Sequence, residues 1–139
     1  SAAAMERLGH RVVYDPAYLR IPYPMGDVPA TLGVCTDEIV RAYRTLGIDL
    51  QRLVHEDMKA NFSLYPRRWG LPRPDTNIDH RRVPNLQVFF ARKGKKLPVT
   101  PRGEDYKAGD IVTWMLPGNL PHIGIATERR SADGKRPLI

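Results

Sequence analysis

The sequence predicts a single α+β domain, with helices first and a small antiparallel sheet last. Apolar residues recur at helical spacing between residues 36 and 93, whereas the last third of the chain combines short β-prone runs with turn signals. The 139 residues, 42% hydrophobic and 27% charged, are typical of one globular domain with a core. We expect this domain to span residues 1–139, with residues 1–11 as a tail.

Irregular segments separate the predicted elements of the first two thirds. A short strand is expected at residues 10–14. The loop after it, residues 15–34, contains closely spaced prolines that exclude a regular helix. Residues 63–84 are again rich in proline, but Trp69 in this stretch indicates a packed loop.

Three helices are predicted from apolar periodicity and end signals. The first should cover residues 36–46 and end at Gly47. The second should cover residues 50–62 with Asp49 as its N-cap. The third should cover about residues 85–93, and Pro84 occupies the position at which this helix should begin.

The C-terminal third predicts a β-hairpin and the beginning of a further strand. Residues 108–114 indicate a turn leading into a strand, and residues 122–127 indicate its partner. Asp133-Gly134 is a strong turn signal. A third strand is expected to begin near Pro137 and to continue beyond Ile139.

The charge balance predicts an anionic partner. The chain has 22 basic and 15 acidic residues, a net charge of +7. Nucleic acid, a membrane surface and an acidic polymer such as the bacterial cell wall all fit this charge. The basic residues are scattered in pairs and form no helical stripe, which disfavours nucleic acid. No apolar run approaches the roughly 20 residues of a transmembrane helix.

Cys35 is the only cysteine, and it lies where the first helix is expected to begin. An intramolecular disulfide is therefore excluded. Free N–H groups at a helix N-terminus favour the thiolate, which is the nucleophilic form of cysteine. The alternative is a small, buried, structural residue.

His122 is the candidate base for this thiol. It stands at the start of the second predicted strand, 87 residues after Cys35. A cysteine on a helix followed by a histidine on a hairpin is the chain order of papain-like folds. On this interpretation Cys35 attacks an amide carbonyl, while His122 accepts the thiol proton and returns it to the leaving amine. A purely structural histidine is the alternative.

The run Asp79-His80-Arg81-Arg82 places four ionisable groups in one loop. One interpretation is a cleft wall in which an arginine binds a substrate carboxylate in a bidentate manner. The other is a salt-bridged surface turn.

Cofactor motifs are missing from the sequence. It contains no CxxC, HExxH, GxGxxG or P-loop pattern, so we expect neither a metal nor a nucleotide cofactor.

Several segments resemble a bacterial family of exported proteins catalogued as domain-of-unknown-function family 1287. The resemblance covers residues 12 to 139, and the run from Arg73 to Leu86 is its most specific part. The segments that carry it are residues 14–18, 21–29, 33–37, 49–58, 73–86 and 109–114.

This family is similar in layout to the NlpC-type papain-like peptidases and amidases, which cut peptidoglycan stem peptides. The resemblance implies that Cys35 is the nucleophile and that the hairpin presents His122 as the base. It also implies a periplasmic or secreted location and a peptidoglycan peptide as substrate, without a cofactor. The candidate substrate-binding residues are Asp37, Asp79, His80 and Arg81.

The sequence departs from the NlpC pattern in two places. NlpC-type enzymes usually carry Asp-Cys-Ser-Gly at the nucleophile, where this chain has Val34-Cys35-Thr36-Asp37. Their histidine is oriented by a residue on the following strand, which we expect beyond Ile139. Within the sequence, Asp37, Asp79 and His80 are the visible substitutes.

Three functions remain open at this stage. The first is a peptidoglycan hydrolase, acting either as a housekeeping enzyme or as an antibacterial effector with an immunity or inhibitor protein. The second is a non-catalytic module that binds the cell wall or another partner. The third is an acyl- or peptidyl-transferase using the same thiol.

Overall fold

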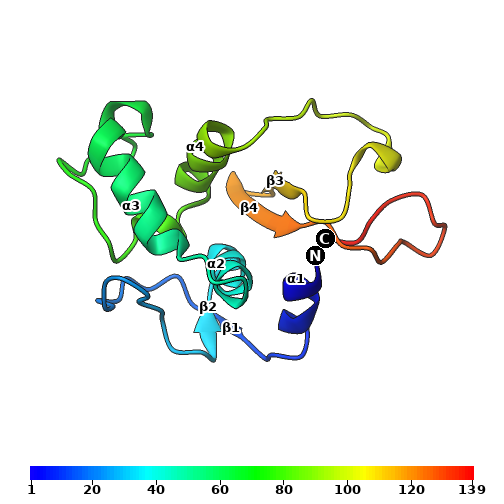
Figure 1. Ribbon diagram of the computed structural model, residues 1–139, viewed down its shortest axis with the longest axis horizontal. Coiled ribbons are helices and arrows are strands. Elements are labelled where there is room, and N and C mark those ends of the chain that lie inside the picture. The colour runs from blue at the N-terminus through cyan, green and yellow to red at the C-terminus, as the bar shows by residue number, and fades with distance from the viewer.

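Helix α2, Cys35–Thr45, lies at the centre of the protein and packs against helices and strands on several sides (Figure 1). The computed structural model describes residues 1–139 and shows a mixed α+β domain. The other helices are α1 (Ala2–Arg7), α3 (Leu50–Asn61) and α4 (Val83–Lys93), with 3-10 turns η1 (Phe62–Leu64), η2 (Asp79–Arg81) and η3 (Gly103–Asp105). The strands are β1 (Val13–Tyr14), β2 (Leu32–Gly33), β3 (Ile111–Leu116) and β4 (Leu120–Ile125).

All three predicted helices are confirmed, with small shifts at their ends. α2 begins one residue earlier than expected, so that Cys35 is its first residue. Gly47 follows it with φ +76°, a conformation that glycine adopts without a Cβ penalty. Asp49 caps α3, because its carboxylate accepts a hydrogen bond from the N–H of Gln51 at 3.1 Å.

The N-terminal segment corrects the prediction of a tail. Residues 2–7 form α1, since three consecutive alanines favour a helix and Ala3 is buried. Arg7 attaches α1 to α2 through an ion pair with Glu38 at 2.9 Å. The predicted loop 15–34 also ends in a strand, because β2 pairs in parallel with β1.

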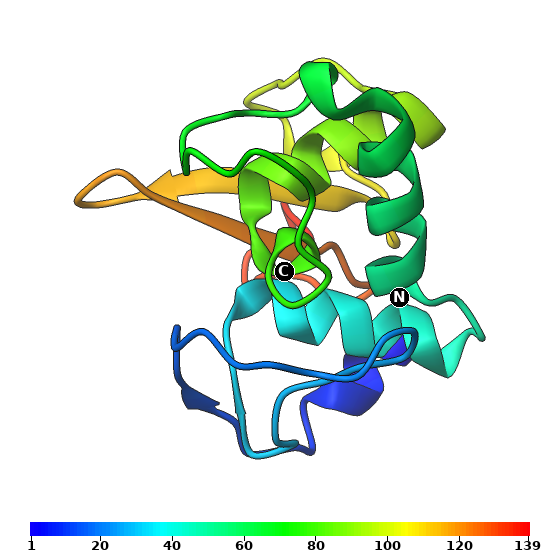
Figure 2. The same cartoon turned by 90° about the vertical axis from the view of Figure 1, so that its left-hand side faces the viewer.

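β3 and β4 form the antiparallel hairpin predicted from the sequence, which extends beyond the helical part of the molecule (Figure 2). Gly118 and Asn119 in its turn have φ values of +81° and +58°. β4 runs from Leu120 to Ile125 rather than over residues 122–127, because pairing with β3 begins directly after the turn. The strand expected near Pro137 is represented by an isolated bridge to Arg130.

The hydrophobic core joins the hairpin to the helices. Val54 of α3 and Leu86 of α4 are completely buried, and Ile123 of β4 is 3% exposed. Ile123 thus fixes the strand that carries His122 against the helical layer. The core consists of Ile39, Val40, Leu50, Val54, Met58, Tyr65, Val83, Leu86, Phe89 and Ile123.

Candidate functional site

Cys35 occupies the first turn of α2, where its own backbone N–H has no partner within the helix. Val34 before it is extended, and the N–H of Val34 donates to Oδ2 of Asp37 at 2.7 Å. This capping interaction closes the first turn around the thiol. The Cys35 side chain is half-buried and packs against the core.

The structure brings Cys35 to strand β4. α2 packs directly against β4, and Cys35 packs against the hydrophobic core, which includes Ile123 of β4. Ile123 follows His122 in the chain. Cys35 and His122, which are 87 positions apart in sequence, thus lie on two elements that pack against each other, α2 and β4.

The pKa of the Cys35 thiol differs from the expectation based on the sequence. Burial raises the pKa of Cys35 above its ordinary value, and the charge of Asp37 raises it further. Backbone hydrogen bonds from Ile123 and from the helix start lower the pKa, but they do not outweigh the loss of hydration. The predicted preference for thiolate at the helix N-terminus is therefore wrong for this structure, because burial favours the neutral thiol.

His122 lies opposite Trp114 in the hairpin. The two rings are 4.8 Å apart between centroids and meet edge to face at 66°. Gly124 makes room for this arrangement, because a Cβ at Gly124 would come within 3.3 Å of the Trp114 ring. The indole therefore restricts the orientation of the imidazole from one side.

Sequence reasoning missed Trp114, although the hairpin turn contained the signal. The turn residues 117–119 pair Leu116 with Leu120, and the same register then places Trp114 opposite His122. Counting back from the turn would have identified this neighbour.

Asp37 and Arg81 form a buried ion pair. Nε of Arg81 lies 2.8 Å from Oδ1 of Asp37, and Nη2 lies 3.0 Å from Oδ2. Both side chains are at most 3% exposed. Because their polar atoms are used within the protein, the geometry supports a positioning role, and direct contact with substrate stays a prediction.

Asp79 and His80 of η2 are also buried, each 2% exposed. Burial raises the pKa of Asp79 to about 6, although its carboxylate accepts a hydrogen bond from the N–H of Asp75 at 2.5 Å. Burial lowers the pKa of His80 to about 4. The loop is therefore a packed turn, which corrects the alternative of a solvated salt-bridged surface; substrate binding by these two residues stays a prediction.

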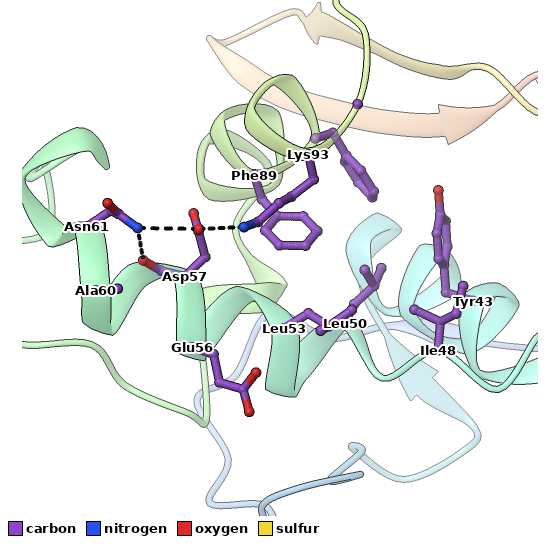
Figure 3. A pocket seen from close by; sticks show the side chains of 12 residues that line it. Tyr43, Ile48, Leu50, Leu53, Glu56, Asp57, Ala60, Asn61, Phe89 and Lys93 are labelled. Atoms are coloured by element: carbon purple, nitrogen blue, oxygen red, sulfur yellow. Dashed lines mark hydrogen bonds and ion pairs between the residues drawn. The ribbon is translucent and has the colours of Figure 1, made fainter.

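A hollow with a volume of about 780 Å³ lies elsewhere, between α3, α4 and the end of α2 (Figure 3). Leu50, Leu53 and Phe89 contribute to its apolar wall, and Asp57 and Lys93 form an ion pair of 3.0 Å at its side (Figure 3). Neither Cys35 nor His122 lines this hollow. It therefore offers no binding site for a substrate of the Cys35 thiol.

Comparison with known families matches residues 1–139 to the family described as domain of unknown function DUF1287. The chain belongs to this family. A relative from Escherichia coli K12, named "Uncharacterized protein YijF", is 51% identical over 136 residues, which are 98% of this chain and 66% of the relative. No solved structure matches the chain.

The family match confirms the family expected from the sequence, whereas the likeness to NlpC-type peptidases stays a prediction. The chain spans about two thirds of the relative's length. No group of three or more His, Cys, Asp or Glu side chains is arranged to hold a metal ion. None of the helices combines the length and the apolar character that crossing a bilayer requires.

Proposed function

We propose that this DUF1287 domain is a cysteine hydrolase that cleaves amide bonds of peptidoglycan stem peptides. The observation that carries the proposal is the packing of α2, which begins at Cys35, against strand β4, which contains His122. A nucleophile, a base and free helix N–H groups are the parts that acyl transfer through a thiol requires.

The proposed reaction begins from the thiol form of Cys35, which burial favours. His122 removes the proton from the Cys35 thiol as the sulfur attacks the substrate carbonyl carbon. N–H groups at the start of α2 stabilise the negative oxygen of the tetrahedral intermediate. The intermediate collapses when the protonated imidazole donates its proton to the departing amine, which leaves a thioester on Cys35.

Water completes the cycle. His122 takes a proton from a water molecule, and the resulting hydroxide attacks the thioester carbonyl. Collapse of this second intermediate breaks the carbon–sulfur bond and releases a carboxylic acid. The proton held by His122 returns to the Cys35 sulfur, so that enzyme and proton balance are restored.

A papain-like arrangement is the finer fold assignment that accompanies this proposal. Its support is the chain order, in which the helix carrying Cys35 precedes the antiparallel hairpin carrying His122. Helix α2 and strand β4 also pack against each other, as a shared catalytic site requires.

The substrate class rests on charge and on the family resemblance. A net charge of +7 favours adsorption to an anionic cell wall. We propose a periplasmic or secreted location, where this substrate is present. The same activity serves either wall maintenance or an antibacterial effector with its own immunity protein.

The test compares the wild type with Cys35→Ala on purified sacculi, using mass spectrometry to follow released peptides. We expect Cys35→Ala to lower release by at least about 10³-fold, because the thioester cannot form. His122→Ala should lower it by about 10²-fold or more. His10→Ala is the matched control, since His10 is exposed and lies outside the hairpin. Equal release by Cys35→Ala and wild type would exclude Cys35 as the nucleophile.

A non-catalytic wall-binding module is the second candidate, favoured by the burial that raises the pKa of Cys35. It predicts binding to sacculi without peptide release. Alkylation of the single thiol would then leave binding unchanged, which the same preparation can measure.

A further inference from the structure

One buried guanidinium, that of Arg81, connects the first turn of α2 to turn η2. Arg81 makes a bidentate contact with Asp37, at 2.8 and 3.0 Å. Oδ2 of Asp37 also accepts the hydrogen bond from the N–H of Val34 at 2.7 Å. The same carboxylate thus holds both Arg81 and the residue that immediately precedes Cys35.

Arg81 extends this connection to two further segments. Its Nη1 donates to the carbonyl of Ala17 at 3.0 Å, and its Nη2 donates to the carbonyl of Asp15 at 3.4 Å. Its own carbonyl accepts a hydrogen bond from the Thr36 hydroxyl at 2.9 Å. The loop at residues 15–17, the start of α2 and turn η2 therefore meet at one side chain.

The Asp37–Arg81 ion pair is better suited to fixing the geometry of the helix start than to adding stability. A buried ion pair contributes little net stability compared with well-packed apolar residues, because both charges lose their hydration. A planar guanidinium facing a carboxylate does, however, define distance and angle on two parallel hydrogen bonds. A fixed distance and angle are useful where a backbone turn must be placed within a fraction of an ångström.

We propose that Arg81 and Asp37 are positioning residues that hold the first turn of α2, and with it Cys35, in register with the His122 strand. The catalytic part of this inference rests on the proposed hydrolase function. This role requires no contact between either residue and the substrate. Their effect reaches the reaction through Val34 and Thr36, the chain neighbours of Cys35 to which they are hydrogen-bonded.

The experiment uses three variants and one matched control. Asp37→Asn keeps the shape but removes the charge, and Arg81→Lys keeps the charge but removes the bidentate contact. The double variant Asp37→Asn/Arg81→Gln removes both charges, so that no unpaired charge stays buried if a single variant fails to fold. Asp27→Asn is the control, because it breaks the 2.9 Å ion pair with Arg41 on the same helix, about two turns from Cys35.

Two readouts separate this inference from the proposed function. With wall peptides as substrate, the three variants should lower kcat by about 10- to 100-fold and leave KM within about threefold, while Asp27→Asn changes kcat by less than about threefold. Hydrogen exchange requires no activity. Amides of residues 34–37 should exchange at least about tenfold faster in the folded variants than in Asp27→Asn, with α3 and α4 unchanged.

The experiment can reject the hydrolase activity and the positioning role separately. If the wild type cleaves no wall peptide, the proposed function fails, and exchange at residues 34–37 alone decides the positioning role. If the three variants match Asp27→Asn in both kcat and exchange, the positioning role is overturned while the hydrolase stands. A rise in KM with unchanged kcat would also overturn it, because that pattern indicates substrate contact.

Discussion

At Cys35, burial and the helix N-terminus act on the same thiol in opposite directions. The N–H groups of the first turn and of Ile123 favour the thiolate, but desolvation is the largest influence and raises the pKa. Burial therefore favours the neutral thiol, which is the less nucleophilic form of cysteine.

Asp79 is a buried residue whose titration should affect stability. Burial raises its pKa to about 6, so the folded protein binds this proton more tightly than the unfolded chain. The stability gained from protonation is fully present below the unfolded pKa of about 4 and is lost as the pH rises through 6. At pH 7 the buried carboxylate therefore costs stability.

We predict that Asp79→Asn raises the free energy of unfolding at pH 7 by about 1–2 kcal/mol and changes it little at pH 4. The amide keeps an oxygen that can accept the hydrogen bond from Asp75 and removes the buried charge. Urea denaturation at the two pH values measures the difference.

Asp75→Asn is the matched control with the opposite sign. Hydrogen bonds from Asn77 and Tyr18 lower the pKa of Asp75 despite its partial burial, so its carboxylate stabilises the fold above pH 4. Asp75→Asn should therefore destabilise the protein at pH 7. A stability loss at pH 7 in both variants would contradict the assignment of Asp79.

At the scale of elements, α3 and α4 are joined through Asp57. Its carboxylate accepts hydrogen bonds from Arg92 at 2.7 Å and from the Tyr65 hydroxyl at 2.7 Å. These contacts hold the pKa of Asp57 below its usual range, so that its contribution to stability is present at neutral pH and is lost on acidification. The contact crosses from one helix to the other beside the apolar hollow in Figure 3.

We predict that Asp57→Asn lowers the free energy of unfolding at pH 7 by about 1–3 kcal/mol, because hydrogen bonds to a charged group are lost. Tyr65→Phe should cost about 1 kcal/mol, since it removes one of these bonds and keeps the buried ring. Denaturation in urea measures both. Equal stability of Asp57→Asn and the wild type would contradict the stabilising role of Asp57 between α3 and α4.

The elements differ in how far the sequence could predict them. α2 and α3 have clear apolar faces, Gly47 follows α2 and Asp49 caps α3, and these local signals were sufficient. β2 is two residues long and depends on pairing with β1, which no local pattern encodes. α1 was missed because its helix is short and is held by the Arg7–Glu38 ion pair, a contact between distant positions.

The residues of the candidate site also differ in how far the sequence could predict them. Cys35 could be placed from sequence because a helix start is a local feature, and His122 because local patterns predict the hairpin strand that contains it. The Asp37–Arg81 pair could not be predicted, because it joins residues 44 positions apart through the packing of η2 on α2. The pKa of Cys35 was mispredicted for a related reason, since burial is a property of the whole fold.

On the scale of the whole molecule, α2 connects the two halves of the proposed site. Its first turn carries Cys35, its side packs against β4, and Arg81 attaches it to η2. The hydrophobic core also includes Ile123 from the hairpin. The overall architecture therefore places the thiol and the histidine strand on one rigid unit, as the proposed thioester chemistry requires.

The most direct test of this chemistry is the mass of the intact protein during turnover. The wild type is mixed with soluble stem peptides, quenched in acid and measured by mass spectrometry. We expect an added mass equal to the acyl portion of the substrate, located on Cys35 and missing in Cys35→Ala. Peptide cleavage by Cys35→Ala at the wild-type rate, without any adduct, would contradict it.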